Sequence, residues 1–172
     1  MGVLDGNPKN EPLHYGEVFG TWTYLKMSHG CVIAYQTFIN HAGDDDLKDL
    51  LKEVIEANKD EIKQIEKLLK KNGVALPPKS PERSNADSND IPNGARVMDP
   101  EISAVLSADI AKGLVDCSAI IGQSIREDIA VMFGKFHMDK SILGAKALRL
   151  SKDKGWLIPP PLHSNTPDND ES

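Results

Sequence analysis

Cysteine is scarce in this chain of 172 residues, and its scarcity excludes two classes of small protein. The sequence contains two cysteines, Cys31 and Cys117, which lie far apart. Secreted domains held by disulfides carry several cysteines, and cysteine-based zinc modules need them in closely spaced pairs. We therefore expect neither a disulfide scaffold nor a zinc module, and both cysteines fall within helical patterns.

An excess of positive charge and long apolar runs are also missing. The 20 lysines and arginines are outnumbered by 26 aspartates and glutamates, which gives a formal net charge of −6, whereas nucleic-acid-binding proteins usually carry a basic surface. No apolar run approaches the roughly 20 residues of a membrane-spanning helix, and residues 1–12 lack the apolar core of a signal peptide. We expect no nucleic-acid partner, no membrane insertion and a cytoplasmic location.

Four stretches with helical periodicity make up most of the chain. The second has the clearest pattern, because apolar residues from Leu47 to Leu69 form one stripe and lysines and glutamates fill the other faces. Those charged faces are predicted to be solvated surfaces with ion pairs four residues apart. The predicted helices cover about 13–41, 44–72, 99–121 and 124–153.

The predicted helix boundaries carry capping signals. Asp99 comes directly before a proline, which suits an N-cap followed by the first helical position. Ser124 and Glu127 have the spacing of a capping box, which predicts that the fourth helix opens at Ser124. Gly43 and Gly73 follow the first and second helices, where glycine commonly ends a helix.

The long segment 73–98 decides the predicted topology. It is rich in proline and turn-forming residues and predicts an irregular connection. About 26 residues can extend to roughly 85 Å, whereas a helix of about 28 residues is about 42 Å long. The connection can therefore run the full length of a bundle. We predict an all-α, ferritin-like four-helix bundle over 13–158, in which this long crossover makes the second and third helices parallel.

The two ends of the chain are polar or rich in proline. Residues 1–12 are predicted to form a flexible arm, and residues 159–172 a disordered tail.

Four short motifs resemble those of one bacterial family. They are Glu17-Val18 with Trp22, the run DDLKDLL over 45–51, Ser124-x-Arg126-x-Asp128, and Lys154-Gly155-Trp156 before a proline run. Over about 11–163 the chain is similar to a family of spore-forming bacilli that is catalogued as a domain of unknown function and often labelled spore-coat-protein-F-like. The resemblance implies a ferritin-like bundle, a place in the spore coat and other coat proteins as partners. It implies no activity.

A ferritin-like bundle raises the question of a carboxylate-bridged metal pair. Such a centre needs a glutamate from each of two helices and Glu-x-x-His from each of the other two. The second predicted helix has no histidine, and its nearest match is Glu53-x-x-Glu56. In the fourth, Gly134 stands where His137 would need a glutamate three residues before it. We therefore expect no di-iron or di-manganese centre and no cofactor.

Glu17 is the most informative charged residue, because it belongs to a core-facing stripe of the first helix. In the predicted topology the first and fourth helices run parallel, so Glu17 lies level with Arg126 and Asp128. A buried glutamate needs a partner, and arginine is a natural one. We predict a structural polar cluster of these three residues. As an alternative, His14 and Glu17 lie one turn apart and could bind a single metal ion together with Asp128.

Catalytic motifs are missing from the sequence. It contains no glycine-rich phosphate loop, no G-x-S-x-G and no H-E-x-x-H. Cysteines within apolar stripes behave as small hydrophobic residues. We expect no catalytic residue and a structural or interaction protein, either a homodimer or a partner of other coat proteins. The alternatives are a metal-binding protein with a mononuclear site and a binder of a small apolar ligand in the bundle core.

Overall fold

The computed structural model describes residues 11–161 and residue 163, and within these it contains helices and loops but no strand. The four long helices are α1 (Tyr15–His41), α2 (Asp45–Lys71), α3 (Asp99–Gln123) and α4 (Glu127–Asp153), and a short 3₁₀ turn, η1 (Ser88–Asp90), lies between α2 and α3.

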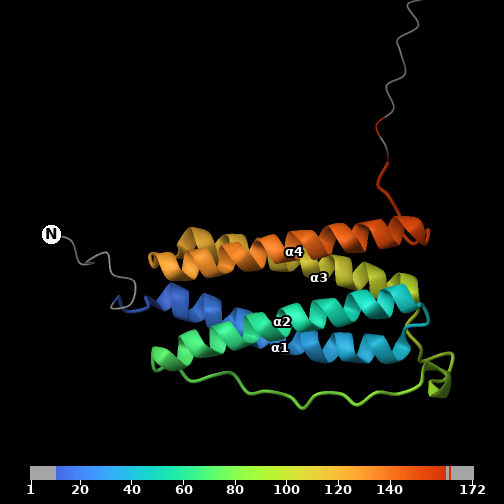
Figure 1. Cartoon of the computed structure of the whole chain (residues 1–172), viewed down its shortest axis with the longest axis horizontal. Coiled ribbons are helices and arrows are strands. Elements are labelled where there is room, and N and C mark those ends of the chain that lie inside the picture. The colour runs from blue at the N-terminus through green and yellow to red at the C-terminus, as the bar shows by residue number, and fades with distance from the viewer. Residues whose placement is uncertain (1–10, 162, 164–172) are drawn as a thin grey trace, which may run out of the picture.

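The helices form two antiparallel pairs that stack as two layers (Figure 1). The first layer is α1 with α2, and the second is α3 with α4. Helices α1 and α4 begin at one end of the bundle, and α2 and α3 begin at the other. The all-α bundle of four helices, with one long crossover between α2 and α3, confirms the predicted fold class.

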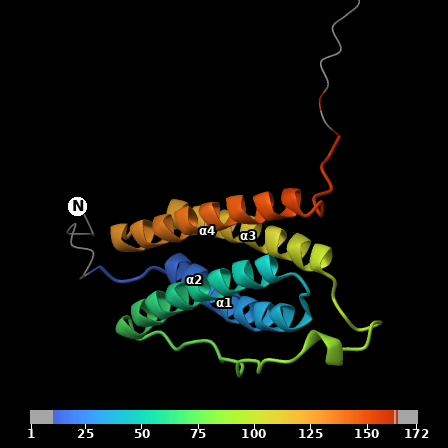
Figure 2. The same cartoon turned by 45° about the vertical axis from the view of Figure 1, so that its right-hand side comes forward.

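The crossover runs along the α1–α2 layer for the length of the bundle (Figure 2). Side chains of α1 fasten it at several points. The Trp22 indole donates to the carbonyl of Ala75 at 2.9 Å. Gln36 accepts from the backbone N–H of Arg83 at 2.9 Å, and Asn40 binds the backbone of Ser84 and Ala86. These bonds hold the irregular segment against α1.

The core lies between the layers and is built from the predicted apolar stripes. Tyr24 of α1 meets Phe133 of α4 edge-on, with ring centroids 5.1 Å apart. This contact lies across the diagonal of the bundle and fills its centre with aromatic rings. The fully buried aliphatic residues around it include Leu25, Leu47, Leu51, Ile65, Leu69, Ile102, Leu106 and Ile129.

Helix α4 begins at Glu127, three residues later than the capping-box signal predicts. Ser124 instead ends α3, because its hydroxyl donates to the carbonyl of Ile120 at 2.7 Å. Arg126 is the N-cap of α4. The predicted capping box is therefore wrong, because α4 starts after Arg126 and not after Ser124.

Helix α3 also starts differently from the sequence signal. Met98, not Asp99, is its N-cap, and Glu101 reaches back to accept from the Met98 N–H at 2.8 Å. Asp99 is thus free to accept from the backbone of Gly43 and Asp44, which joins the start of α3 to the α1–α2 turn.

The ends of the chain are only partly described. Of the predicted flexible arm, residues 1–10 lie outside the described residues, whereas Glu11 is buried at 8% exposure. Of the predicted tail, residues 159–161 and 163 are exposed, and the remainder lies outside the described residues. Just before the tail, Trp156 packs against the core.

Candidate functional site

Glu17 lies in the first turn of α1 and is buried at 2% exposure. Its Oε2 accepts from the backbone N–H of His14 at 3.1 Å, which completes a capping box on α1. Its Oε1 accepts from the backbone N–H groups of Ile125 and Arg126, each at 3.0 Å. These groups stand at the start of α4, where a negative charge is favourable to the helix dipole. Glu17 therefore caps two helices at once.

The Arg126 side chain is also buried and joins three segments of the chain. Its Nε and Nη2 donate to the two carboxylate oxygens of Asp128 at 3.0 and 2.7 Å. Its Nη1 donates to the Glu11 carbonyl and to Asn72 Oδ1, at 3.0 and 3.1 Å. The hydrogen bond with Asp128 is the main cause of the raised pKa of Arg126. The guanidinium thus fastens the N-terminal segment and the end of α2 to the start of α4.

The predicted cluster residues lie together, but their partners differ from those expected. The Arg126 guanidinium pairs with Asp128, while Glu17 contacts Arg126 through its backbone N–H. The short α3–α4 connection explains the difference. It leaves two backbone N–H groups with no intrahelical acceptor, and these need the Glu17 carboxylate.

The candidate metal ligands are already engaged in hydrogen bonds. His14 Nδ1 accepts from the Gly16 N–H at 3.0 Å, so its Nε2 carries the proton that it donates to the Gln123 carbonyl at 3.1 Å. The oxygens of Glu17 and Asp128 accept from the groups described above. In the described part of the chain, no three residues among histidine, cysteine, aspartate and glutamate come together in a way that could hold a metal ion. In this arrangement His14, Glu17 and Asp128 are all used by hydrogen bonds within the protein.

A second polar cluster lies at the centre of the bundle, with one side chain from each helix. Lys140 Nζ of α4 donates to both carboxylate oxygens of Glu61 of α2, at 2.8 and 3.0 Å. The Tyr24 hydroxyl of α1 donates to Glu61 Oε2 at 2.9 Å and lies 3.5 Å from Cys117 Sγ of α3. Glu61 is 3% exposed. The core therefore contains an ammonium–carboxylate pair.

Burial dominates the electrostatics of this central cluster. It raises the pKa of the Glu61 carboxyl, and the Lys140 ammonium opposes that rise. Burial, followed by the Glu61 charge, raises the pKa of Tyr24 far above its usual value, and burial also raises the pKa of the Cys117 thiol. The phenol and the thiol thus stay protonated at neutral pH. A raised thiol pKa disfavours the reactive thiolate.

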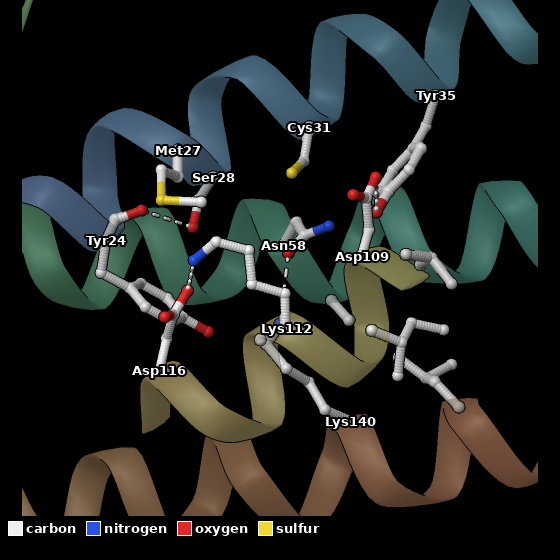
Figure 3. A pocket seen from close by; sticks show the side chains of 15 residues that line it. Tyr24, Met27, Ser28, Cys31, Tyr35, Asn58, Asp109, Lys112, Asp116 and Lys140 are labelled. Atoms are coloured by element: carbon white, nitrogen blue, oxygen red, sulfur yellow. Dashed lines mark hydrogen bonds and ion pairs between the residues drawn. The ribbon is translucent and has the colours of Figure 1, made fainter. Parts of the chain in front are cut away.

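A cavity of about 50 Å³ lies beside the central cluster and is bounded by all four helices. Cys31, Asn58, Asp109 and Lys140 are among its lining residues (Figure 3). On one wall the Tyr35 hydroxyl donates to Asp109 at 3.2 Å. A cavity of this size suits a few water molecules, whereas pockets for small organic ligands occupy roughly 300–1,000 Å³. The cavity beside the central cluster is therefore smaller than an ordinary pocket for a small organic ligand.

Sequence reasoning missed the central cluster because it assigned the charges of the second helix to solvent. The spacing nevertheless contains a signal. In α2, Glu61 continues the heptad positions of Val54, Asn58 and Ile65. In α4, Lys140 occupies a core position four residues after the buried Phe136. A charge of each sign at core positions of two helices could have predicted a buried pair.

A family model described as a protein of unknown function (DUF3231) matches residues 1–168. The chain belongs to this family. Membership confirms the resemblance that the motifs around Glu17, Arg126 and Trp156 indicated. Within the described residues, none of the helices of this family member is long and apolar enough to cross a bilayer.

Two close relatives of the chain come from bacilli. It is 63% identical over 163 residues to the uncharacterized protein YvdQ of Bacillus subtilis (strain 168), covering 95% of this chain and 96% of YvdQ. It is 62% identical to a Bacillus halodurans C-125 protein whose crystal structure is described as that of a proposed spore coat protein. That match covers 92% of this chain and 100% of the other, with a TM-score of 0.91.

A distant structural neighbour shares the fold alone. The Mycobacterium tuberculosis conserved hypothetical protein rv2844 has a TM-score of 0.64 and 9% identity, over 80% of this chain and 98% of its own.

Proposed function

We propose that this protein is a non-enzymatic structural component of the bacterial spore coat that acts through its surfaces. The observation that carries the proposal is the close similarity to the Bacillus halodurans protein, which extends over nearly the whole of both chains. The two folds superpose with a TM-score of 0.91, so the assembly surfaces of both proteins are built on the same helices.

The two polar clusters support a structural role. Among the described residues, every buried side-chain nitrogen or oxygen has a hydrogen-bond partner. Catalytic groups are commonly held in a cleft with a pKa tuned for reaction. Here Glu17 and Arg126 join helix ends, Glu61 and Lys140 neutralise each other, and Cys117 is a buried thiol. The charged groups of the core therefore hold helices together.

Localisation in spores tests the proposal. We would replace YvdQ in Bacillus subtilis by this chain with a C-terminal fluorescent tag, under the native promoter. The expected result is fluorescence around the developing spore and recovery of the protein in the detergent-extracted coat fraction. The tag alone, expressed from the same promoter, is the control. Uniform fluorescence in the mother cell, with none of the protein in the coat fraction, would refute a coat role.

A further inference from the structure

The outward surface of the α3–α4 layer carries almost no charge along its centre. On α3, an exposed stripe with alternating spacings of four and three residues is formed by Ala104, Ala108, Ala111, Val115, Ser118 and Gly122. On α4, an exposed stripe of the same kind is formed by Val131, Gly134, Met138, Ser141, Ala145 and Leu148. Val115, Val131 and Met138 are 60–67% exposed. Water-facing stripes of surface helices are normally polar, so this face is typical of a buried one.

The two stripes lie on the same side of the helix pair. Helices α3 and α4 meet through a 2.8 Å hydrogen bond between Ser103 and Ser151. Ala104, the first stripe position on α3, comes one residue after Ser103, and Lys152, which lies one helical turn beyond Leu148 in line with the α4 stripe, comes one residue after Ser151. A helix turns about 100° per residue, so both stripes face away from the core beside the α3–α4 seam. The crossover runs along the other layer, and no described segment runs along this one (Figure 1).

Opposite charges stand at the two ends of the α4 stripe. Glu127 precedes it and Lys152 follows it, and both are exposed. They are about 37 Å apart along the helix at about 1.5 Å per residue. If two α4 helices cross antiparallel midway between Met138 and Ser141, Glu127 of each copy meets Lys152 of the other. The charges at the ends of the α4 stripe are thus complementary to those of an antiparallel α4 stripe in a second copy.

The apolar positions are complementary under the same reversal. Val131 of one copy meets Leu148 of the other, and two small residues meet where Gly134 faces Ala145. The apolar stripes are about 27 Å long, and with the charged ends at Glu127 and Lys152 included the face measures about 37 Å by 20 Å for two adjacent helices, or roughly 700 Å². A standard interface buries about 800 Å² on each partner. The face is therefore large enough for a stable dimer.

We propose that this face of α3 and α4 is a homodimer interface, across which a second copy packs its own α3 and α4 antiparallel about a two-fold axis. The inference rests on the proposed function, since a coat component must bind other proteins. It identifies one of these proteins as a second copy of this chain. Isologous packing of this kind is the commonest arrangement of soluble oligomers.

Molar mass in solution tests the interface. The chain of 18.8 kDa is expected to elute at twice that mass in light-scattering chromatography. Met138→Glu places a charge at the centre of the face and should give the monomer mass. Phe19→Glu is the matched control, because Phe19 is 73% exposed on α1, and it should remain dimeric. Circular dichroism checks that both variants keep their helicity.

A charge exchange tests the antiparallel register. Glu127→Lys and Lys152→Glu each place like charges together at two symmetric positions and should raise the dimer Kd by about tenfold. The double variant restores opposite charges and should return the Kd to that of the wild type. Failure of the double variant to recover would overturn this register.

The outcomes separate this inference from the proposed function. A wild-type protein of 18.8 kDa at every concentration would overturn the homodimer, and coat localisation would then point to a different coat protein on this face. Loss of dimerisation in Phe19→Glu but not in Met138→Glu would overturn the assigned surface. A dimer that never reaches the coat would refute the proposed function and leave the interface standing.

Discussion

Replacing Lys140 by methionine should destabilise the protein strongly at neutral pH, because it leaves the Glu61 carboxylate without its cation. The two side chains are 12% and 4% exposed. Removing one partner of a buried ion pair costs about 3–5 kcal/mol. The Tyr24 hydroxyl still donates to Glu61, so we expect the unfolding free energy to fall by about 3 kcal/mol, near the lower end of that range. For a chain of this size that loss lowers the Tm by roughly 6–12 °C.

The loss should depend on pH with a defined sign. The pKa of Glu61 is already raised above its usual 4.5 in the folded protein by burial, and the Lys140 charge opposes that rise. Without the lysine the folded-state pKa rises further, so the folded state holds a proton that the unfolded state releases. The unfolding free energy of Lys140→Met therefore falls relative to wild type as pH increases above about 4.5. Near pH 4, where Glu61 is mostly protonated in both states, the deficit is smaller.

Urea unfolding followed by circular dichroism at pH 4 and pH 7.5, at one protein concentration, measures this effect. Lys146→Met is the matched control on the same helix, because its ion pair with Glu53 is about half exposed. The unfolding free energy of the control variant should fall by only about 0.2–1 kcal/mol. Combining Lys140→Met with Glu61→Gln should recover much of the loss at pH 7.5. Equal losses for the two lysine variants, or a Lys140→Met deficit independent of pH, would refute the buried-charge argument.

Three further predictions concern the helix ends. Arg126→Lys loses the two-point pairing with Asp128 and should lower the unfolding free energy by about 2 kcal/mol; an unchanged urea midpoint would contradict this. Gly73 follows α2 with φ 72°, so Gly73→Ala should lower the unfolding free energy by about 1 kcal/mol. Gly30→Ala, within α1, should not lower it in the same assay. Elemental analysis of untagged protein should find no stoichiometric metal, and iron, manganese or zinc lost in Glu17→Gln would contradict the hydrogen-bonded role of Glu17.

Helix α2 shows what the periodicity of a sequence can predict and what it cannot. Its apolar stripe predicts which face is buried, and Leu47, Leu51, Ile65 and Leu69 are fully buried. The same pattern leaves Glu61 among the solvated charges, because lysines and glutamates surround it. Only the packing of α4 brings Lys140 against it, 79 positions away in the chain.

The α3–α4 connection shows the opposite case, in which a local signal is present but is used differently. Ser124 and Glu127 have capping-box spacing, yet the serine hydroxyl serves α3. The N-cap position then passes to Arg126, whose backbone N–H binds a carboxylate from α1. Local spacing could not reveal this, because the competing acceptor comes from another helix.

The sequence by itself determined the number of helices, their approximate limits and the topology of the bundle. These follow from interactions within one or two helical turns and from the length of segment 73–98, and both can be read directly from the sequence. The tertiary structure decided which charges meet. Whether Glu17 binds a guanidinium or two backbone N–H groups, and whether Glu61 meets water or Lys140, depends on the rotation and height of one helix against another. Those quantities are set by packing of the whole core, so no single helix encodes them.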